Sequence, residues 1–224
     1  MKLRPYQQES KTDAYDIWKL TPLAKILLVK PTGSGKTVTM ASIIRDHKGS
    51  ACAIAHRQEL VGQISMALAR EGITHNIIGP KEVVTECVRD HTQELGRSWY
   101  DPSALVAVAG VDTLTRRKDS LKDWMKTVTL WVIDEAHHLL KDNKWGIAAA
   151  LFPNAKGLGV TATPLRADGA GLGEHADGLF THMIEGPTMR WLIDNGYLTD
   201  YRIFAPPGDF VMTDDEIGST GDYS

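Results

Sequence analysis

The sequence predicts an α/β domain with a mostly parallel central sheet and helices on both faces. Short apolar runs alternate with segments of helical periodicity along most of the chain, and this alternation is typical of right-handed crossovers between parallel strands. The runs 51–55 and 105–109 contain no charged residue, which indicates strands that are covered on both faces. The Gly-, Asp- and Thr-containing motifs follow such runs directly. They should therefore lie at the carboxyl edge of the sheet, where open α/β sheets bind ligands.

The first third of the chain is predicted to hold a leading helix and two strand–helix units. Pro5 suits the first turn of a helix, and Thr21-Pro22 ends that helix before an apolar run. We expect an inward stripe of Val38, Ala41, Ile43 and Ile44 on the next helix. The expected elements are a helix over 5–19, a strand over 25–29, a helix ending near 48–49, a strand over 51–55, a helix reaching 70 and a strand within 73–78.

The rest of the chain continues the alternation after one irregular segment. Residues 80–102 are interpreted as an insertion between core units, in which valines suggest a helix and Trp99-Tyr100 an aromatic loop. The glycines at 169, 171 and 173 indicate a loop. The expected elements are strands over 105–109, 130–133 and 157–160, helices over 120–126, 144–151 and 187–195, and an edge strand over 201–204.

Composition points to an ordinary globular protein without a membrane span. The chain has 224 residues, of which 42% are hydrophobic and 24% charged. No apolar stretch approaches about 18 residues, and the first residues lack the apolar core of a signal peptide. We therefore expect a cytoplasmic protein. The net charge is −3, so any nucleic-acid surface must be a local patch.

The segment Pro31-Thr32-Gly33-Ser34-Gly35-Lys36-Thr37 has the features of a phosphate-binding loop between a strand and a helix. Gly33 and Gly35 allow the backbone to turn so that successive N–H groups point at an anion. Lys36 supplies a positive charge for the outer phosphates, and the Thr37 hydroxyl can ligate Mg²⁺. Lys30 stands where the usual motif has its first glycine. We expect nucleotide phosphates and Mg²⁺ as ligands.

Asp134 and Glu135 follow the apolar run 130–133. Asp134 suits the protein-side ligand for Mg²⁺, directly or through water. Glu135 projects differently and can orient and deprotonate an attacking water. Lys36, Asp134 and Glu135 are thus the candidate catalytic residues.

The histidines and cysteines could instead indicate a metal site. His137 and His138 are adjacent, and Cys87 and His91 have helical i,i+4 spacing, but neither pair has a matching second pair of ligands. We prefer a hydrogen bond from a histidine beside the acidic pair to the next motif, where Thr161 and Thr163 offer hydroxyl groups.

Five stretches in order resemble the N-terminal RecA-like motor domain of superfamily 2 DEAD/DEAH-box helicases. The branch is the one that contains phage helicases, restriction-enzyme motor subunits and excision-repair helicases. The stretches are Leu3-Arg4-Pro5-Tyr6-Gln7, the phosphate loop, Ala55-His56-Arg57-Gln58-Glu59-Leu60, Asp134-Glu135-Ala136-His137 and residues 160–169.

The resemblance implies roles that the residues alone leave open. Gln7, with Arg4 nearby, would read the adenine edge, since an amide both donates and accepts. His137, Thr161 and Thr163 would couple hydrolysis to movement of a nucleic-acid strand. The residues that would contact the sugar-phosphate backbone are His56, Arg57, Gln58, Asp112 and Thr113.

The resemblance also implies a domain organisation. Residues 1–205 would form the ATP-binding domain, and the acidic segment 206–224 would be a linker toward a second RecA-like domain that supplies arginine fingers. Without those arginines the domain should bind ATP yet hydrolyse it poorly. The expected partners are that second domain and nucleic acid, DNA rather than RNA.

Two other functions are open to the same residues. A nucleotide-gated clamp would use bound ATP to hold nucleic acid without hydrolysing the ATP. Such a clamp has no need of the water-activating Glu135. A P-loop kinase would leave Asp134-Glu135-Ala136-His137 and Thr161-Ala162-Thr163 without an obvious role.

Overall fold

A single parallel sheet of seven strands organises the fold, in the order β3-β4-β2-β5-β6-β1-β7. The computed structural model describes residues 2–55, 57–166 and 169–202. Every strand pair in this part of the chain is parallel, so all motifs that follow strands lie at one edge. The strands are β1 (Lys25–Val29), β2 (Ser50–Ala55), β3 (Asn76–Ile78), β4 (Val106–Gly110), β5 (Val128–Asp134), β6 (Lys156–Thr161) and β7 (His182–Glu185).

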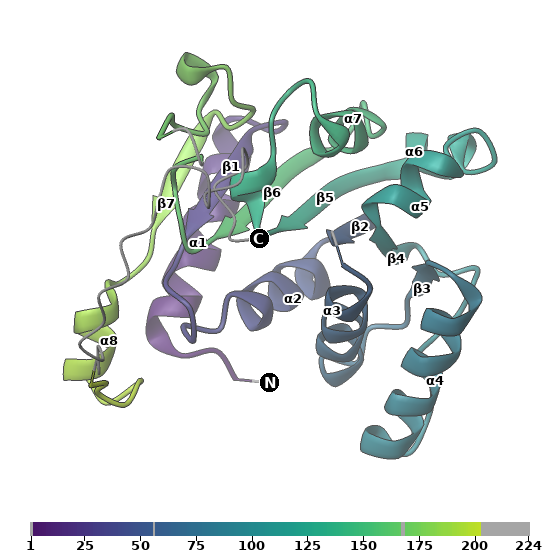
Figure 1. Ribbon diagram of the computed structural model, residues 1–224, viewed down its shortest axis with the longest axis horizontal. Coiled ribbons are helices and arrows are strands. Elements are labelled where there is room, and N and C mark those ends of the chain that lie inside the picture. Colours follow the sequence, from purple (N-terminus) through teal and green to yellow (C-terminus); the bar gives the residue numbers. More distant parts are fainter. Residues whose placement is uncertain (1, 56, 167–168, 203–224) are drawn as a thin grey trace, which may run out of the picture.

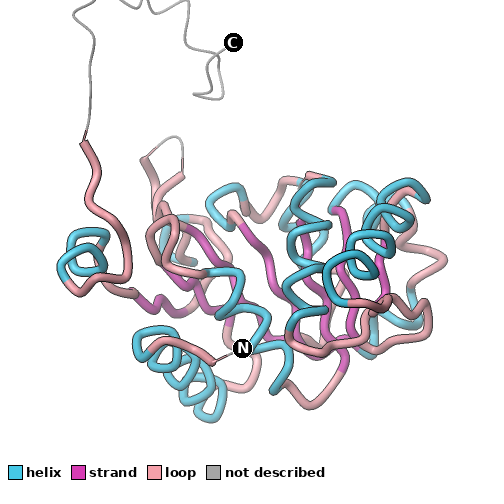
Figure 2. The backbone as a smooth tube through the Cα atoms, turned by 90° about the horizontal axis from the view of Figure 1, so that it is seen from below, coloured by secondary structure: helices cyan, strands magenta, loops and turns pink. Residues whose placement is uncertain are grey.

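Helices cover both faces of this sheet, which confirms the predicted fold class (Figures 1 and 2). In Figure 1, α1 to α4 lie below the sheet and α5 to α7 lie above it. The helices are α1 (Pro5–Leu20), α2 (Lys36–Asp46), α3 (Gln58–Arg70), α4 (Lys81–Leu95), α5 (Val111–Arg116), α6 (Lys122–Thr127), α7 (Lys144–Ala150) and α8 (Met189–Asp194), with 3-10 turns η1 (Ala136–His138) and η2 (Glu174–Ala176). None of the described helices is both long and apolar enough to cross a bilayer.

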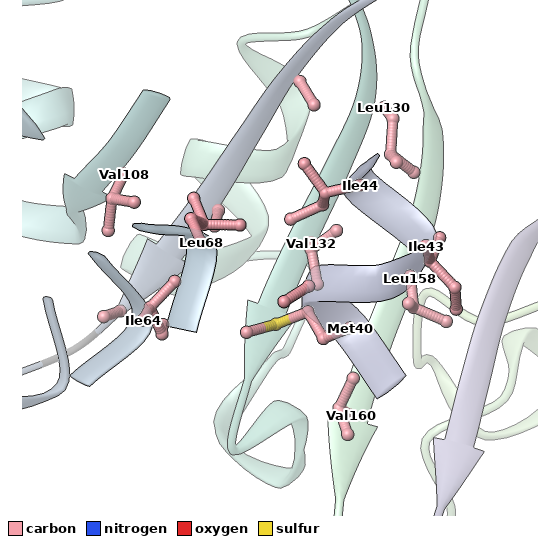
Figure 3. Packing of buried hydrophobic residues seen from close by; sticks show 14 of the residues in the cluster. Met40, Ile43, Ile44, Ile64, Leu68, Val108, Leu130, Val132, Leu158 and Val160 are labelled. Carbon is pink, nitrogen blue, oxygen red and sulfur yellow. The ribbon is translucent and has the colours of Figure 1, made fainter. Parts of the chain in front are cut away.

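The two faces of the sheet carry separate apolar clusters, because successive side chains on a strand point to opposite faces. On the lower face, α2 packs its apolar residues onto Val132 and Leu158, while α3 packs beside Val108 (Figure 3). The stripe of α2 differs from the prediction, since Met40 is buried while Val38 is half-exposed. Each fully buried aliphatic side chain contributes about 1.5–3 kcal/mol, so this packing fixes the helix that follows the phosphate loop.

The upper face has a close contact between β5 and β6. Trp131 and Gly157 are register partners on these neighbouring strands, and Trp131 is 1% exposed. A Cβ atom built on Gly157 would lie 2.1 Å from Cζ2 of Trp131. The ring thus occupies the space that any side chain at residue 157 would need.

Gly157→Ala is expected to lower the free energy of unfolding by about 1–3 kcal/mol, because the enclosed indole must shift to admit a methyl group. Chemical denaturation measures this change. Gly62→Ala in the interior of α3 is the matched control, because nothing lies within 4 Å of its Cβ position. There the same substitution should stabilise by about 0.5–1 kcal/mol. Equal effects at the two glycines would contradict the packing argument.

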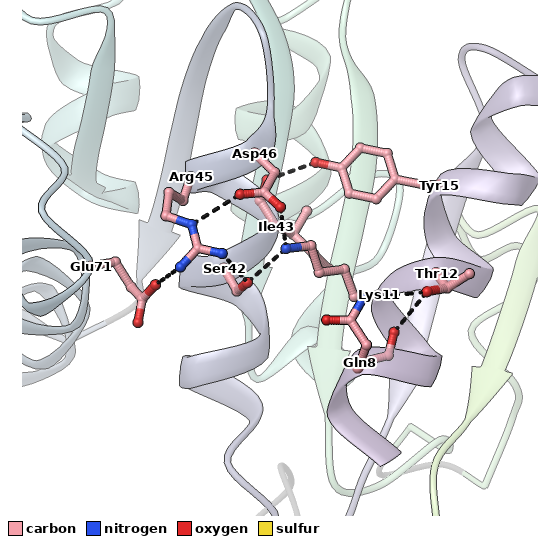
Figure 4. Close-up of polar contacts among 9 residues, drawn as sticks. All are labelled: Gln8, Lys11, Thr12, Tyr15, Ser42, Ile43, Arg45, Asp46 and Glu71. Carbon is pink, nitrogen blue, oxygen red and sulfur yellow. Dashed lines mark hydrogen bonds and ion pairs between the residues drawn. The ribbon is translucent and has the colours of Figure 1, made fainter. Parts of the chain in front are cut away.

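A polar network holds α1 against α2 (Figure 4). The buried Lys11 donates through Nζ to Ser42 Oγ at 2.8 Å and also contacts the Asp46 carboxylate. The Tyr15 hydroxyl donates to Ile43 O at 2.9 Å. Burial, and then the nearby Asp46 charge, raise the pKa of Tyr15 to about 12. These contacts fix the leading helix beside the helix that carries Lys36.

Three regions differ from the sequence expectations. In the predicted insertion 80–102, α4 packs on α3 and places Val83 and Cys87 in the core, so the segment serves as the crossover from β3 to β4. Strand β7 was not predicted, and it pairs with β1 at the sheet edge. Of the expected edge strand 201–204, residues 201–202 lie outside any strand, and residues 203–204 lie outside the described part, as does the predicted linker 206–224.

A buried histidine pair joins α3 to α4. The Ser65 hydroxyl lies 2.7 Å from His75 Nε2 and 3.1 Å from His91 Nε2. His75 Nδ1 lies 2.8 Å from Ile73 O, and Trp99 N donates to His91 Nδ1 at 3.3 Å. Both rings fit this pattern in the neutral form: His91 donates to Ser65, Ser65 donates to His75, and His75 donates to Ile73. Zinc binding by Cys87 and His91 gains no support, since no group of three candidate metal ligands occurs within the described residues.

Acidification should weaken the fold through His75. Burial lowers the pKa of His75 to about 4, whereas an unfolded chain has a histidine pKa of about 6.5. The unfolded state therefore binds more protons between these values. The stabilisation is complete above about pH 6.5 and is lost as the pH falls.

We expect a loss of about 2 kcal/mol from His75 between pH 7.5 and pH 5, measured by urea denaturation at both values. His75→Gln should shrink this difference. The same change at the exposed His175 serves as the control. If His75→Gln loses as much unfolding free energy between pH 7.5 and pH 5 as the unaltered chain, His75 is not the source of the pH dependence.

Candidate active site

Three motifs meet at the carboxyl edge of three adjacent strands. The phosphate loop follows β1, Asp134 ends β5 and Thr161 ends β6. In the sheet these strands are neighbours, because β6 lies between β5 and β1. The chain thus gathers residues that are more than a hundred positions apart into one site.

The phosphate loop has the backbone that an anion site needs. Gly33 and Gly35 adopt positive φ angles of 80° and 79°, which favour glycine. Lys36 and Thr37 are the first residues of α2, so the positive end of the helix dipole faces the loop. Ser34 Oγ is buried and has no hydrogen-bond partner within the described residues. An orphaned hydroxyl in a glycine-containing loop at a helix N-terminus fits an anionic ligand.

Lys30 replaces the first glycine of the usual motif without occupying the loop. It is 0% exposed, and its Nζ lies 3.5 Å from both Tyr6 O and Thr39 Oγ1. Burial lowers its pKa to about 8, against the raising effect of Glu9 and Asp13. Its side chain thus reaches beneath the loop toward α1 and α2.

Gln7 braces the phosphate loop from α1. Its Nε2 donates to Ser34 O at 2.9 Å, and its Oε1 accepts from Arg4 N at 2.9 Å. Gln7 is 5% exposed, so both ends of its amide contact protein in this structure. The adenine contact of Gln7 and Arg4 stays a prediction. Sequence reasoning missed Tyr6, whose hydroxyl donates to the same Ser34 O at 2.9 Å.

The acidic pair lies at the end of β5 in a strained turn. Glu135 has a φ of 51°, a conformation that is rare outside glycine and that concentrates at functional sites. Its N–H donates to Asp134 Oδ1 at 3.0 Å. A threonine hydroxyl and a carboxylate form the oxygen set that Mg²⁺ prefers, with most of its shell left to phosphates and water. Thr37 and Asp134 therefore fit a magnesium site by their chemistry.

His137 links the acidic pair to the end of β6. Its Nδ1 lies 3.1 Å from Thr161 Oγ1 and 3.3 Å from Glu135 Oε2. The Thr161 hydroxyl donates to Thr163 O at 3.0 Å and accepts from Thr163 N at 3.1 Å. Since the Thr161 proton is already used, His137 Nδ1–H must be the donor in its contact with Thr161. The structure brings all three predicted coupling residues together, and their coupling role stays a prediction.

The predicted nucleic-acid residues lie on the other half of the same edge. Arg57 and Gln58 are exposed between β2 and α3, while His56 lies outside the described residues. Asp112 lies in the first turn of α5 after β4, and its carboxylate accepts from Lys144 Nζ at 3.1 Å. Thr113 is half-buried. Strands β2 and β4 are neighbours, so these residues share one region, and their contact with nucleic acid stays a prediction.

Comparison with known proteins identifies similar chains. A family model described as "Type III restriction enzyme, res subunit" matches residues 1–166. The chain is 27% identical over 184 residues to a "51.5 kDa protein" of Lactococcus phage (isolate 7-9), covering 81% of this chain and 32% of the relative. It is 28% identical over 210 residues to a "Putative mitochondrial ATP-dependent helicase irc3" of Schizosaccharomyces pombe, covering 87% of this chain and 32% of the relative. The chain thus spans about a third of the length of these curated relatives.

Solved structures share the fold at low identity. The UvsW helicase of bacteriophage T4 matches with a TM-score of 0.57 and 16% identity, covering 83% of this chain and 60% of that chain. A nuclease-deletion mutant of the Type ISP restriction-modification enzyme LlaGI, in complex with a DNA substrate mimic, matches with a TM-score of 0.62 and 14% identity, covering 88% of this chain and 21% of that chain.

Proposed function

Because the chain belongs to the type III restriction enzyme res subunit family, we propose that it is the ATP-binding motor domain of an ATP-dependent nucleic-acid helicase or translocase. It is similar to the N-terminal RecA-like domain of superfamily 2 helicases, as the sequence motifs predict. The observation that carries the proposal is the meeting of the phosphate loop, the acidic pair and Thr161 at the edge of β1, β6 and β5.

The residues of this site have different roles in ATP hydrolysis. The loop N–H groups, other than that of Ser34, which donates to Pro31 O at 3.2 Å, bind the triphosphate together with the Lys36 ammonium. Thr37 and Asp134 would hold Mg²⁺, which would neutralise charge on the phosphates. Glu135 orients the attacking water and accepts its proton. His137 and Thr161 connect Glu135 to the end of β6, the strand between the acidic pair on β5 and the phosphate loop on β1.

The same proposal includes partners. Nucleic acid would cross the exposed Arg57 and Gln58 at the start of α3, and DNA is the first choice because LlaGI was solved with a DNA substrate mimic. A second RecA-like domain would close the site from the solvent side and supply arginines. Since an arginine finger is worth about 10³–10⁵ in rate, the chain by itself should hydrolyse ATP slowly.

The test is a titration of a fluorescent ATP analogue into the chain with Mg²⁺ or with EDTA, followed by phosphate release with and without single-stranded DNA. We expect saturable, Mg²⁺-dependent binding and slow release that DNA stimulates. If the chain binds no nucleotide in the presence of Mg²⁺, the proposal is wrong. ATP-dependent retention of DNA with no phosphate release would favour a nucleotide-gated clamp.

A further inference from the structure

The segment that follows β7 folds back onto the phosphate loop. We define the arm as residues 189–198, which comprise α8 and the turn after it. Gly196 has a φ of 70° and reverses the chain. The N–H groups of Tyr197 and Leu198 then donate to Leu192 O at 2.8 and 3.1 Å. Leu192 is fully buried, so the turn is anchored on the arm's own helix.

Three aromatic rings attach the arm to α1. The ring of Tyr197 lies 5.1 Å from that of Tyr6, at 72°, and 5.8 Å from that of Trp191, at 18°. Tyr6 is the residue whose hydroxyl donates to Ser34 O in the phosphate loop. Trp191 nevertheless remains 42% exposed. The rings therefore form a contact at the edge of the site rather than a closed core.

Arg4 joins the arm through long hydrogen bonds. Its Nη1 lies 3.4 Å from Tyr197 O and 3.3 Å from the Tyr6 hydroxyl, and its guanidinium lies 5.3 Å from the centre of the Tyr197 ring. Bonds of this length are weak, so a ligand can redirect the guanidinium at little cost.

Leu198 touches the phosphate loop itself. Its Cδ2 lies 3.0 Å from the position of a Cβ built on Gly33, and its Cδ1 lies 3.8 Å away. Gly33 is one of the two glycines whose positive φ shapes the loop. The Leu198 side chain thus packs against the turn that must present N–H groups to phosphate.

We propose that Tyr197 and Leu198 are positioning residues for the nucleotide and that the arm changes its contacts when the phosphate loop is occupied. This inference rests on the proposed ATP-binding function. Leu198 holds the turn at Gly33, and Tyr197 holds Arg4 beside the opening of the site. Coupling between two sites is reciprocal: if the arm favours the loop conformation that binds ATP, bound ATP must favour the docked arm.

The test combines affinity with an optical signal from the arm. Leu198→Ala should raise the dissociation constant for a ribose-labelled fluorescent ATP about fivefold, while Leu198→Met should stay within about twofold because it restores most of the contact. Unlabelled ATP should change the tryptophan emission of the unaltered chain. That change should be absent in Trp191→Phe, which still binds the labelled nucleotide.

Control variants separate the possible outcomes. Leu20→Ala removes the same side-chain atoms at an 87% exposed position and should change nothing, and thermal unfolding of each variant reports its fold. Suppose that Lys36→Ala abolishes ATP binding, whereas Leu198→Ala binds ATP as tightly as the unaltered chain. This result would contradict the proposed role of the arm and leave the proposed ATP-binding function standing. A full emission change in Trp191→Phe would also contradict the proposed role of the arm. Absence of binding by the unaltered chain would overturn the proposed function and the arm with it.

Discussion

Glu135→Gln is expected to slow phosphate release by about 100-fold or more while ATP still binds. Glutamine keeps the size of the side chain but cannot accept the proton of an attacking water. Glu135 lies in the strained turn after β5, with a φ of 51°, and His137 Nδ1 lies 3.3 Å from its carboxylate. Single-turnover release of radiolabelled phosphate, with protein in excess over ATP, measures the rate.

The matched control for this prediction is Glu174→Gln. Glu174 is an exposed carboxylate in η2, away from the sheet edge that carries the site. The control should release phosphate at the unaltered rate. Equal rates in Glu135→Gln and the unaltered chain would remove Glu135 from the mechanism and would reopen the clamp as a function.

Lys36→Ala is expected to weaken the binding of Mg-ATP by about 100-fold, which corresponds to about 2.7 kcal/mol. A charge-assisted hydrogen bond to phosphate is worth about 1.5–3 kcal/mol. Within the described residues no hydrogen bond or ion pair is formed by the Lys36 side chain, so its removal leaves no buried group unpaired. Alanine also suits the first turn of a helix, and the fold should be unaffected.

Lys48→Ala is the control, because it removes the same charge from an exposed position just after α2. Isothermal titration with ATP and Mg²⁺ should give the unaltered affinity for this variant. A loss of similar size at Lys48 and Lys36 would show that net charge, rather than the phosphate loop, governs binding.

The interior strands and the phosphate loop could be predicted from the sequence because their signals are local. β1, β2 and β5 are nearly unbroken apolar runs, and both faces of each are covered. β7 carried no such signal, since only Ile184 of its four residues is buried. The contribution of α4 to the core was missed because its buried face includes the polar His91, which hydrogen-bonds to Ser65 instead of facing water.

The sequence predicted each motif of the site separately. It did not predict the contacts between the motifs. Nothing local in the sequence indicates that Gln7 binds the loop backbone at Ser34 or that Leu198 rests on Gly33. These contacts depend on how α1 and the arm dock on the sheet, which only the tertiary structure specifies. Lys30 is a similar case: the sequence shows a missing glycine, and the structure shows a lysine that extends beneath the loop.

The strand order has a consequence for synthesis of the chain. β1 emerges early from the ribosome, yet it lies between β6 and β7, where Ile26 pairs with Leu158 and with His182. β2, β3 and β4 follow one another more closely along the chain and pair together. Pairing of distant segments is slow because a long loop must close first. A nascent chain that ends before His182 would therefore carry every residue of the phosphate loop, while its strand still lacks one of the two neighbours that hold it in place.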